Sequence, residues 1–594
     1  MKFSDLLAEW LVELGYTHCF FVAGGNIMHL LESCSRRFDC IPVVHEVAAG
    51  VAAEYFTEIS ENEKAFALVT AGPGLTNIVT AIAGAYLESR ELLVLGGQVK
   101  VADLARGEVR QRGIQEVNGV EIVRPITVRS TLLEDVVDRS ALVEIVNATT
   151  HGRKGPVFIE IPLDVQGRDV TAENLDVQIA SMVPAISVVS EDVLQELVAR
   201  LGNAQRPVLL IGGGVTRATA TSLLGQLNQI GIPIMTTWNG MDRIPADHPL
   251  FFGRPNTWGQ RSSNILLQQA DLLLALGTRL GLQQTGFNWR AFVPIGDVVH
   301  VECDPAELHK GHPHVALRIV GDANEVLRYL TEQSLGDYSE WCEFCRSVRG
   351  TIPLVEKVNH TGEGYLSPFV FVQGLSRLCN GEDVVVPCSS GGAYTVMMQA
   401  FEMKRGQKLV TNKGLAAMGY GLSGAIGAAF AAKGRRTILV EGDGGFMQNM
   451  QELGTVSVNR LNMKIFIFGD NGYASIRMTQ SSYFGGRYVG CDTETGLGIP
   501  NWKYIFAAYD IPMMEIGPGF EENAEFRRSF EVTGAAAFVV RIDPKQTYFP
   551  KITSRITSDG SMASNPLHLM SPDLPDEVAS MVMPYLKHGA KTSE

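Results

Sequence analysis

The chain has 594 residues, of which 45% are hydrophobic and 19% charged, with 61 glycines and 26 prolines. This composition is typical of a folded protein of several domains, and it excludes both a single small module and wholesale disorder. Lysine and arginine total 50 against 64 aspartates and glutamates, a formal charge of −14, so no basic excess is present to neutralise nucleic acid or an anionic membrane.

The compartment is predicted from three features. Asp5 and Glu9 interrupt the apolar stretch that a signal peptide needs. The nine cysteines are odd in number and scattered, which favours a reducing compartment over a disulfide framework. Residues 414–432 are uncharged and long enough to cross a bilayer, but their many small side chains favour a buried, closely packed helix. We therefore expect a cytoplasmic protein without a membrane span.

Short β-branched runs recur along the chain, each ending in a Gly- or Asp-rich turn and followed by a helical pattern. They are, in order, AFALVTAGPG, PVLLIGGGV, DLLLALGTR, VVHVECDP, DVVVPCSSGG, TILVEGDGG, KIFIFGDNG and AFVVRIDP. This alternation predicts α/β domains built on doubly wound parallel sheets. Because ligands bind beyond the carboxyl ends of such strands, the Gly-rich turns are the expected places for a site.

Two stretches without sustained periodicity, residues 169–189 and 350–367, are predicted to connect domains. They divide the chain into three α/β domains at residues 1–175, 188–350 and 365–545. A Pro-punctuated tail at residues 546–594 follows, and we expect its residues 550–575 to be nearly free of regular structure. The tail could be a lid over a site or a wrap on the surface.

The most informative segment is RTILVEGDGGFMQNMQELGTV, a strand that ends in GDGG at residues 442–445 and is followed by a helix. Glycines let a backbone approach a phosphate, and a helix N-terminus favours its charge. Asn471 follows the next strand, so adjacent parallel strands would bring its amide oxygen to the Asp443 carboxylate. With a main-chain oxygen near Tyr473, these ligands suit Mg²⁺ bound to a diphosphate. An Asp in a Gly-rich turn is, by itself, most often only a turn residue.

At these residues the sequence resembles the thiamine-diphosphate enzymes of the decarboxylase and carboligase type, whose signature is GDG followed by Asn. Further landmarks of that family stand in the expected order: VAGGN (22–26), PVVHEVAAG (42–50), TAGPGLTN (70–77), RQRGIQE (110–116), SSGG (389–392) and GLAAMGYGLSGAIGA (414–428). Within the family the chain is similar to the acetolactate (acetohydroxyacid) synthase branch. The resemblance covers nearly the whole chain and implies a pyrimidine-binding, a central Rossmann-like and a diphosphate-binding domain.

Glu46 lies in an apolar stretch, where composition alone allows a first-turn Glu that the helix dipole favours. The resemblance implies that Glu46 bonds the cofactor's aminopyrimidine nitrogen and is the activating residue. Met418 matches the bulky apolar residue that props the cofactor in a bent shape, although most buried methionines only fill gaps. The Ala416 carbonyl would accept from the exocyclic amine, at a position where the family commonly has Gly. His45 is expected to be structural.

The resemblance also implies the ligands of the metal and of the cofactor. Asp443, Asn471 and the main-chain oxygen of Tyr473 would hold Mg²⁺, and Gln115 and Gly25 would line the reaction centre. The remaining residues expected to bind thiamine diphosphate are Ser389, Ser390, Gly391, Gly392, Gly442, Gly444, Gly445 and Ile476.

The middle domain contains IGGGV, LGTRLG, VECDPAEL and IVGDANEV, which resemble the FAD-binding segments of the acetolactate synthase branch. The residues that this resemblance assigns to FAD are Gly212, Gly213, Gly277, Arg279, Asp304 and Asp322. Gly-rich turns after strands are also how α/β domains close, and no GxGxxG stands here. A bound FAD would have a structural role, because carboligation needs no net redox step.

The sequence departs from acetolactate synthases after the metal asparagine, where those enzymes have a Trp that narrows the acceptor pocket. Here YASIRMTQSSYF (473–484) has Gln480 or Ser481 at about that place. A small polar residue predicts room for a larger or more hydroxylated acceptor. Arg477 and Arg487 could face that space, or could be solvated. The tail and the widened pocket resemble the yersiniose-type carboligases of branched-sugar biosynthesis.

The expected activity is decarboxylation of pyruvate and transfer of the two-carbon unit to a carbonyl acceptor, either a bulky ketone or a nucleotide-linked keto-deoxysugar. Acetolactate synthesis from two 2-oxo acids and cleavage of a C–C bond in a diketone are alternatives on the same cofactor. A noncatalytic regulatory protein that binds a nucleotide or thiamine diphosphate and a nicotinamide-dependent dehydrogenase are alternatives of another class. In the family, Glu46 and GDG at one cofactor come from different subunits, which implies a homodimer or homotetramer with small-molecule substrates.

Overall fold

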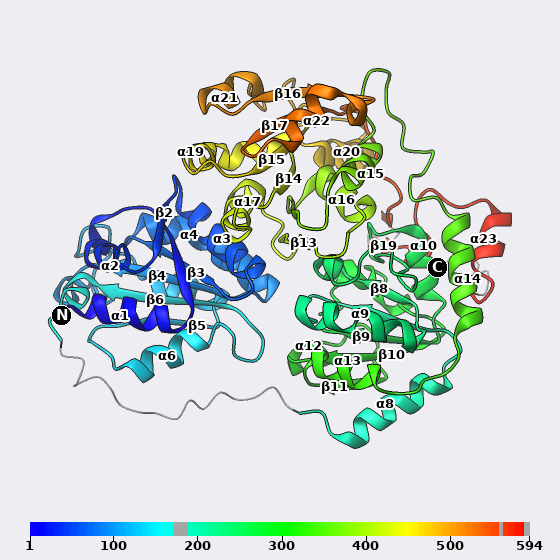
Figure 1. Cartoon of the computed structure of the whole chain (residues 1–594), viewed down its shortest axis with the longest axis horizontal. Helices are drawn as coiled ribbons and strands as arrows, with labels where there is room; N and C mark the ends of the chain where they lie inside the picture. The colour runs from blue at the N-terminus through cyan, green and yellow to red at the C-terminus, as the bar shows by residue number, and fades with distance from the viewer. Residues whose placement is uncertain (171–187, 557–561, 587–594) are drawn as a thin grey trace. The chain divides into compact units, whose positions relative to one another are not determined.

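The protein is described by a computed structural model that covers residues 1–170, 188–556 and 562–586 (Figure 1). The predicted connection at 169–189 therefore lies almost entirely outside the described residues. Contacts between residues divide the chain into two compact units. The first unit takes residues 1–170, 382–394 and 408–544 of the described chain, and the second takes 188–381, 395–407 and the tail from 545.

Two six-stranded parallel sheets form the first unit. The sheet nearer the N-terminus has the order β2-β1-β3-β4-β6-β5, with β1 (Tyr16–Phe21), β2 (Asp39–Pro42), β3 (Lys64–Val69), β4 (Leu92–Gln98), β5 (Arg129–Leu132) and β6 (Pro156–Pro162). Its helices are α1 (Phe3–Glu13), α2 (Met28–Cys34), α3 (Glu46–Ile59), α4 (Pro73–Glu88), α5 (Gly119–Val123), α6 (Arg139–Asn147) and α7 (Leu163–Gln166). β3, β4 and β6 are almost continuously apolar because helices cover both faces of the sheet.

The second sheet of this unit has the order β13-β12-β14-β15-β17-β16. Its strands are β12 (Val384–Pro387), β13 (Lys408–Leu409), β14 (Thr437–Gly442), β15 (Met463–Gly469), β16 (Met513–Ile516) and β17 (Ala536–Arg541). The helices around it are α16 (Gly391–Ala400), α17 (Tyr420–Ala431), α18 (Asp443–Phe446), α19 (Leu453–Val458), α20 (Ala474–Phe484), α21 (Trp502–Ala508) and α22 (Ala524–Glu531). One hydrophobic core runs from α3 to α17 and joins the two sheets.

A five-stranded parallel sheet forms the centre of the second unit, in the order β11-β10-β9-β7-β8. Its strands are β7 (Pro207–Ile211), β8 (Ile234–Thr236), β9 (Leu272–Leu276), β10 (Asp297–Glu302) and β11 (Leu317–Val320). The helices are α8 (Glu191–Asn203), α9 (Arg217–Ile230), α10 (Arg261–Gln268), α11 (Leu282–Thr285), α12 (Pro305–His309), α13 (Ala323–Thr331), α14 (Ser339–Thr351) and α15 (Pro368–Leu378). Three parallel-sheet α/β domains were predicted, and the three sheets confirm that fold class.

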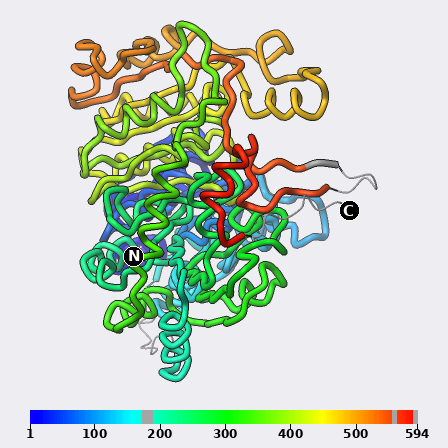
Figure 2. The backbone as a smooth tube through the Cα atoms, turned by 90° about the vertical axis from the view of Figure 1, so that its right-hand side faces the viewer, coloured from blue at the N-terminus to red at the C-terminus, as the bar shows by residue number. Residues whose placement is uncertain are grey.

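The tail differs from the prediction, because it contains regular structure. Strands β18 (Ser554–Ile556) and β19 (Met562–Ser564) pair antiparallel, and α23 (Asp576–Val582) follows. Figure 2 shows the tail running beside the middle domain. The Ile552 amide donates to the Thr257 carbonyl at 2.8 Å, and the Gln269 side chain donates to the Val582 carbonyl at 2.9 Å. The apolar face of α23 is buried against the domain, which is the reason that the tail becomes ordered there.

The segment weighed as a membrane span is not one continuous helix. Its helical part is α17, and all but one of the residues of α17 are buried. In the described part of the chain we find no helix with the length and apolar character needed to cross a membrane. All nine cysteines lie in the described residues and are free.

Candidate active site

The predicted metal residues meet at the carboxyl ends of β14 and β15, which are adjacent and parallel. The Asp443 carboxylate accepts a hydrogen bond from the Gly444 amide at 2.7 Å and from the Gly472 amide at 3.1 Å. The second bond ties the GDG segment to the turn that contains Asn471. Parallel strand ends therefore bring the two motifs together, as the spacing of the motifs predicted.

Asp443 is 1% exposed, and it is the first residue of α18. The helix predicted after this strand therefore begins within the GDGG turn itself. Burial raises the pKa of Asp443 to about 6, although the Gly444 and Gly472 amides favour its charged form. A divalent cation would offset this desolvation. Among the described residues no three His, Cys, Asp or Glu side chains gather around a possible metal, so such a cation would depend on amide, main-chain and phosphate oxygens as well.

The glycines at this edge of the sheet fall into two groups, one open to a ligand and one closely packed. A Cβ added to Gly391 or Gly442 would meet no atom within 4 Å, so the backbone there faces open space. A Cβ on Gly444 would lie 2.3 Å from the Tyr473 ring, and a Cβ on Gly445 would lie 2.9 Å from the Glu441 side chain. The first pair leaves room for a phosphate, and the second pair lets the metal-site turns pack tightly.

The loop before α17 carries the residues expected to face the cofactor. Ser389 is buried, and its hydroxyl donates to the Ala417 carbonyl, which joins the end of β12 to this loop. Ala416 has φ of 58°, a left-handed conformation that explains why Gly would also suit this position. Met418 is 40% exposed, so it does not fill a gap in the core. Ile476, in the first turn of α20, is exposed as well.

Glu46 is the first residue of α3 and is 8% exposed. Its carboxylate accepts a hydrogen bond from the Asn77 side chain in α4 at 2.9 Å. His45 is the N-cap of α3, and its ring accepts from the Val47 amide at 3.2 Å. The structural role predicted for His45 is therefore supported by this cap. Asn77 was not singled out from the sequence, although it closes the motif TAGPGLTN.

Gln115 and Gly25 both lie near the carboxyl ends of strands in the first sheet. Gln115 has φ of 64°, and a Cβ on Gly72 would lie 2.2 Å from its carbonyl oxygen. Gly25 begins a short 3-10 turn after β1, and a Cβ there would meet no atom within 4 Å. The backbone at Gly25 is therefore open, while the Gln115 carbonyl approaches the turn that begins α4 closely.

The two modules of the first unit pack together through α3 and α17 (Figure 1). A Cβ on Gly427 of α17 would lie 2.0 Å from the Ala52 carbonyl of α3, so the helices approach closely. The buried Glu54 carboxylate accepts from the Tyr420 hydroxyl at 2.7 Å and from Arg90 at 2.9 Å. These modules belong to one chain, and residues 188–381 of the second unit lie between them in the sequence. The pairing of modules between subunits stays a prediction.

Arg477 is buried, so the alternative of a solvated side chain is wrong. Its guanidinium donates to the Asp470 carbonyl at 2.7 Å and to the Asn471 carbonyl at 3.2 Å. Gln480 also bonds the backbone, since its amide nitrogen donates to the Val489 carbonyl at 3.1 Å and its oxygen accepts from the Val489 amide at 3.0 Å. Both side chains support the turns around the predicted metal site. Arg487 is exposed.

The residues assigned to FAD lie along the carboxyl edge of the sheet in the second unit. Gly212 and Gly277 follow β7 and β9, and the Gly277 carbonyl accepts from the Gly214 amide at 2.9 Å. Gly213 lies beside Gly212, and the half-buried Arg279 follows Gly277. Asp304 and Asp322 follow β10 and β11 and cap α12 and α13 through amides at 2.9 and 2.8 Å. The carboxylates already have structural partners, so FAD binding stays a prediction.

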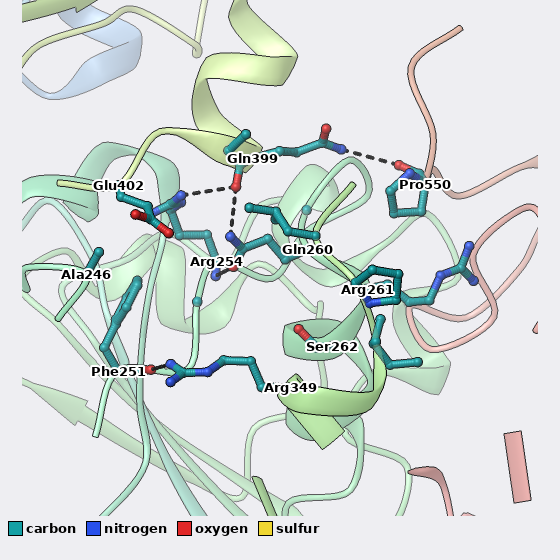
Figure 3. A pocket seen from close by; sticks show the side chains of 16 residues that line it. Ala246, Phe251, Arg254, Gln260, Arg261, Ser262, Arg349, Gln399, Glu402 and Pro550 are labelled. Atoms are coloured by element: carbon teal, nitrogen blue, oxygen red, sulfur yellow. Dashed lines mark hydrogen bonds between the residues drawn. The ribbon is translucent and has the colours of Figure 1, made fainter. Parts of the chain in front are cut away.

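A separate cavity of about 330 Å³ lies in the second unit, and Figure 3 shows its lining. Arg254 extends beside it and donates to the Met398 carbonyl at 2.8 Å and the Phe401 carbonyl at 2.9 Å, at the end of α16. Burial lowers the pKa of Arg254 to about 10, and the negative end of α16 compensates its charge. None of the residues predicted for the site lines this cavity.

Comparison with known proteins identifies the family. Residues 1–122 match the N-terminal TPP-binding domain of thiamine pyrophosphate enzymes, residues 194–330 the central domain, and residues 390–540 the C-terminal TPP-binding domain. Acetolactate synthase of Mycobacterium bovis is 30% identical over 82% of this chain and 78% of its own length.

Acetolactate synthase isozyme 1 large subunit of Escherichia coli (strain K12) is 28% identical over 92% of this chain and 95% of its own length. Acetolactate synthase 2, chloroplastic, of Zea mays is 28% identical over 93% of this chain and 87% of its own length. Each matched domain contains strands of one of the three sheets. The chain therefore belongs to the thiamine pyrophosphate enzymes, in their acetolactate synthase-like branch.

Proposed function

We propose that the protein is a thiamine-diphosphate-dependent carboligase that decarboxylates pyruvate and transfers the two-carbon unit to a carbonyl acceptor. The observation that carries this proposal is the contact between Asp443 and Gly472, because it joins the two motifs that a metal–diphosphate site needs. Family membership supports the cofactor, and the names of the relatives support carbon–carbon bond formation from 2-oxo acids.

Each part of the edge has a role in this proposal. Asp443, Asn471 and the Tyr473 carbonyl hold Mg²⁺, and the backbone from Ser389 to Gly392 and at residues 442–445 holds the diphosphate. When bound, the cofactor supplies the electron sink that decarboxylation of a 2-oxo acid requires. Glu46 holds a proton at its carboxylate toward the aminopyrimidine, and Asn77 orients that carboxylate.

The acceptor is proposed to be large, either a bulky ketone or a nucleotide-linked keto-deoxysugar as in the yersiniose-type carboligases. Two features of α20 and of the turn that follows it support this. The Gln480 amide is engaged with Val489, so no bulky side chain extends from that position. Beyond it, Tyr483, Phe484 and Tyr488 are exposed, and aromatic rings of this kind can stack on a sugar or a base.

FAD binding and oligomerisation are further parts of the proposal. A Cβ on Gly212 would lie 2.2 Å from the Gly277 carbonyl oxygen, whereas a Cβ on Gly213 would meet no atom closer than 3.5 Å, so the backbone at Gly213 can be approached by a dinucleotide. A homodimer or homotetramer is supported by apolar side chains that stand exposed near the site, notably Val109 and Ile114. Light scattering of the purified protein, with its absorbance between 350 and 500 nm, would measure both properties.

The test of the function is CO₂ release from pyruvate by the purified protein with thiamine diphosphate and Mg²⁺. Mass spectrometry of the products is run with 2-oxo acids, simple ketones and keto-sugar nucleotides as competing acceptors. A two-carbon adduct on a ketone or keto-sugar supports the proposal. Acetolactate as the sole product would assign the activity of the named relatives instead, and no CO₂ with any substrate would refute the carboligase and leave diketone cleavage.

A further inference from the structure

A buried glutamate links the segment of the predicted metal site to the helix of Glu46. Glu452 ends the 3-10 turn Met447–Glu452, which directly follows α18 and therefore continues from Asp443. Its side chain is fully buried, and burial raises the pKa of its carboxyl. An ionised carboxylate in such a place must be compensated by hydrogen bonds or an opposite charge.

The compensation comes from the backbone immediately before α3. The Val44 amide lies 3.0 and 3.2 Å from the two carboxylate oxygens of Glu452, and the His45 amide lies 3.0 Å from one of them. The Thr455 hydroxyl donates to the other oxygen at 2.8 Å. Because Val44 and His45 directly precede Glu46, this carboxylate holds the start of α3 at its N-terminal, positive end.

The side chains around Glu452 are largely apolar, so packing by itself does not require a carboxylate here. The neighbouring Leu453 and Val456 belong to the hydrophobic core that joins the two modules. Burying a carboxylate there costs desolvation free energy. What a carboxylate provides in return is directional bonding, because short charge-assisted hydrogen bonds to two successive amides fix the distance and the orientation of the backbone.

We infer that Glu452 is a positioning residue for Glu46, fixing the backbone from which the Glu46 carboxylate extends. This inference rests on the proposed function, in which Glu46 acts on the aminopyrimidine. Glu452 itself touches neither Glu46 nor any predicted metal ligand through a hydrogen bond that the described residues show. Its effect is transmitted through the backbone of residues 44 and 45.

The first test is structural and needs no cofactor. In Glu452→Gln, the remaining carbonyl oxygen can still accept from both amides, but the second bond from the Val44 amide and the negative charge that strengthens these bonds are lost. Hydrogen–deuterium exchange of the unliganded full-length variant should rise in the peptide containing residues 44 and 45. Thr455→Val is the matched control, because it removes only the hydroxyl bond to the same carboxylate, and its peptide should exchange close to the wild-type rate.

The second test measures the reaction centre. Proton–deuterium exchange at the C2 carbon of bound thiamine diphosphate should slow about tenfold to a hundredfold in Glu452→Gln. The fold-change in the cofactor's dissociation constant should be smaller than the fold-change in this exchange rate. A general loss of folding would not produce that difference. Glu452→Asp keeps the charge but shortens the side chain, and it serves if the Gln variant fails to fold.

Wild-type exchange rates in both Glu452 variants, at C2 and at the amides, would overturn the inference. Glu46→Gln is measured in parallel, so that a failure of this inference can be told apart from a failure of the proposed function. If Glu46→Gln leaves C2 exchange unchanged, or if the wild-type protein binds no thiamine diphosphate, the proposed function fails instead. A rise in amide exchange at residues 44 and 45 without any change at C2 would show a purely structural clamp and would also refute the positioning role.

Discussion

Arg477 provides a sharp test of how the predicted metal site is held. Its guanidinium donates to the Asp470 carbonyl at 2.7 Å, to the Asn471 carbonyl at 3.2 Å and to the Cys491 carbonyl at 3.4 Å. It also lies 3.4 Å from the Asp470 carboxylate, and both side chains of this ion pair are less than a tenth exposed. Arg477→Met removes all these bonds while keeping a long apolar side chain.

The size of the effect follows from what the substitution leaves behind. Asp470 would remain buried without its cation, and breaking one side of a buried pair costs about 3–5 kcal/mol. Burial and the nearby Asp443 raise the pKa of Asp470, so proton uptake by this carboxyl limits the loss to the lower part of that range. The turn that contains Asn471 loses hydrogen bonds from Arg477 as well. If this weakens Mg²⁺ binding by about 1.4 kcal/mol, the Mg²⁺ concentration needed for half-saturation rises tenfold.

The assay is urea unfolding of the full-length protein, combined with titration of Mg²⁺ at saturating thiamine diphosphate. Arg487→Met is the matched control, because Arg487 is exposed. The unfolding free energy of this variant should lie within about 0.5 kcal/mol of the wild-type value. Asp470→Asn combined with Arg477→Met should recover part of the loss, since no buried charge then remains. If Arg477→Met matches the Arg487→Met control in both measurements, the support assigned to this side chain does not exist.

Three further changes test buried features of the first unit. Burial raises the pKa of Glu160 to about 8, so the carboxyl stays neutral in the folded state but ionises in the unfolded state above about pH 4.5. Wild type therefore loses stability as the pH rises, and the unfolding free energy of Glu160→Gln relative to wild type should increase by about 3–5 kcal/mol between pH 4.5 and 8. A difference that stays constant with pH would contradict this. Gly427→Ala, whose Cβ would lie 2.0 Å from the Ala52 carbonyl, should destabilise by about 1–3 kcal/mol in urea unfolding. Arg90→Met leaves the buried Glu54 carboxylate without its cation and should cost about 3–5 kcal/mol, seen as a lower Tm.

The strands and the edge at which the site lies could be predicted from sequence, because local patterns determine them. Apolar runs that end in Gly-rich turns indicated β14 and β15, and parallel pairing then required Asp443 and the turn after β15 to meet. The small residues of α17 indicated close helix packing, and the approach of Gly427 to α3 has that character. These inferences need only periodicity and the geometry of parallel sheets.

The partners of buried charges could not be predicted in the same way. Glu452 and Val44 are separated by 408 positions, and no local pattern near either residue indicates the other. Arg477 was expected to be solvated or to face the acceptor, because an arginine on a helix is usually exposed; its acceptors are backbone carbonyls, which have no sequence signature. The helix in the tail was missed for a different reason, since the apolar spacing of Val578, Val582 and Met583 stands among prolines that suggested an irregular segment.

The segment from Asp443 to Glu452 illustrates why a short motif underdetermines a site. Its beginning bonds the turn after β15, and its end bonds the backbone before α3, so one segment holds both the predicted metal ligands and the helix of the predicted activating residue. The first bond joins neighbouring strands and could be anticipated from GDG and Asn alone. The second joins modules built on different sheets, and it holds the backbone directly before Glu46. The motif match indicates the ligands of the predicted metal site, whereas the placement of the α3 start depends on Glu452, a carboxylate outside the GDG motif.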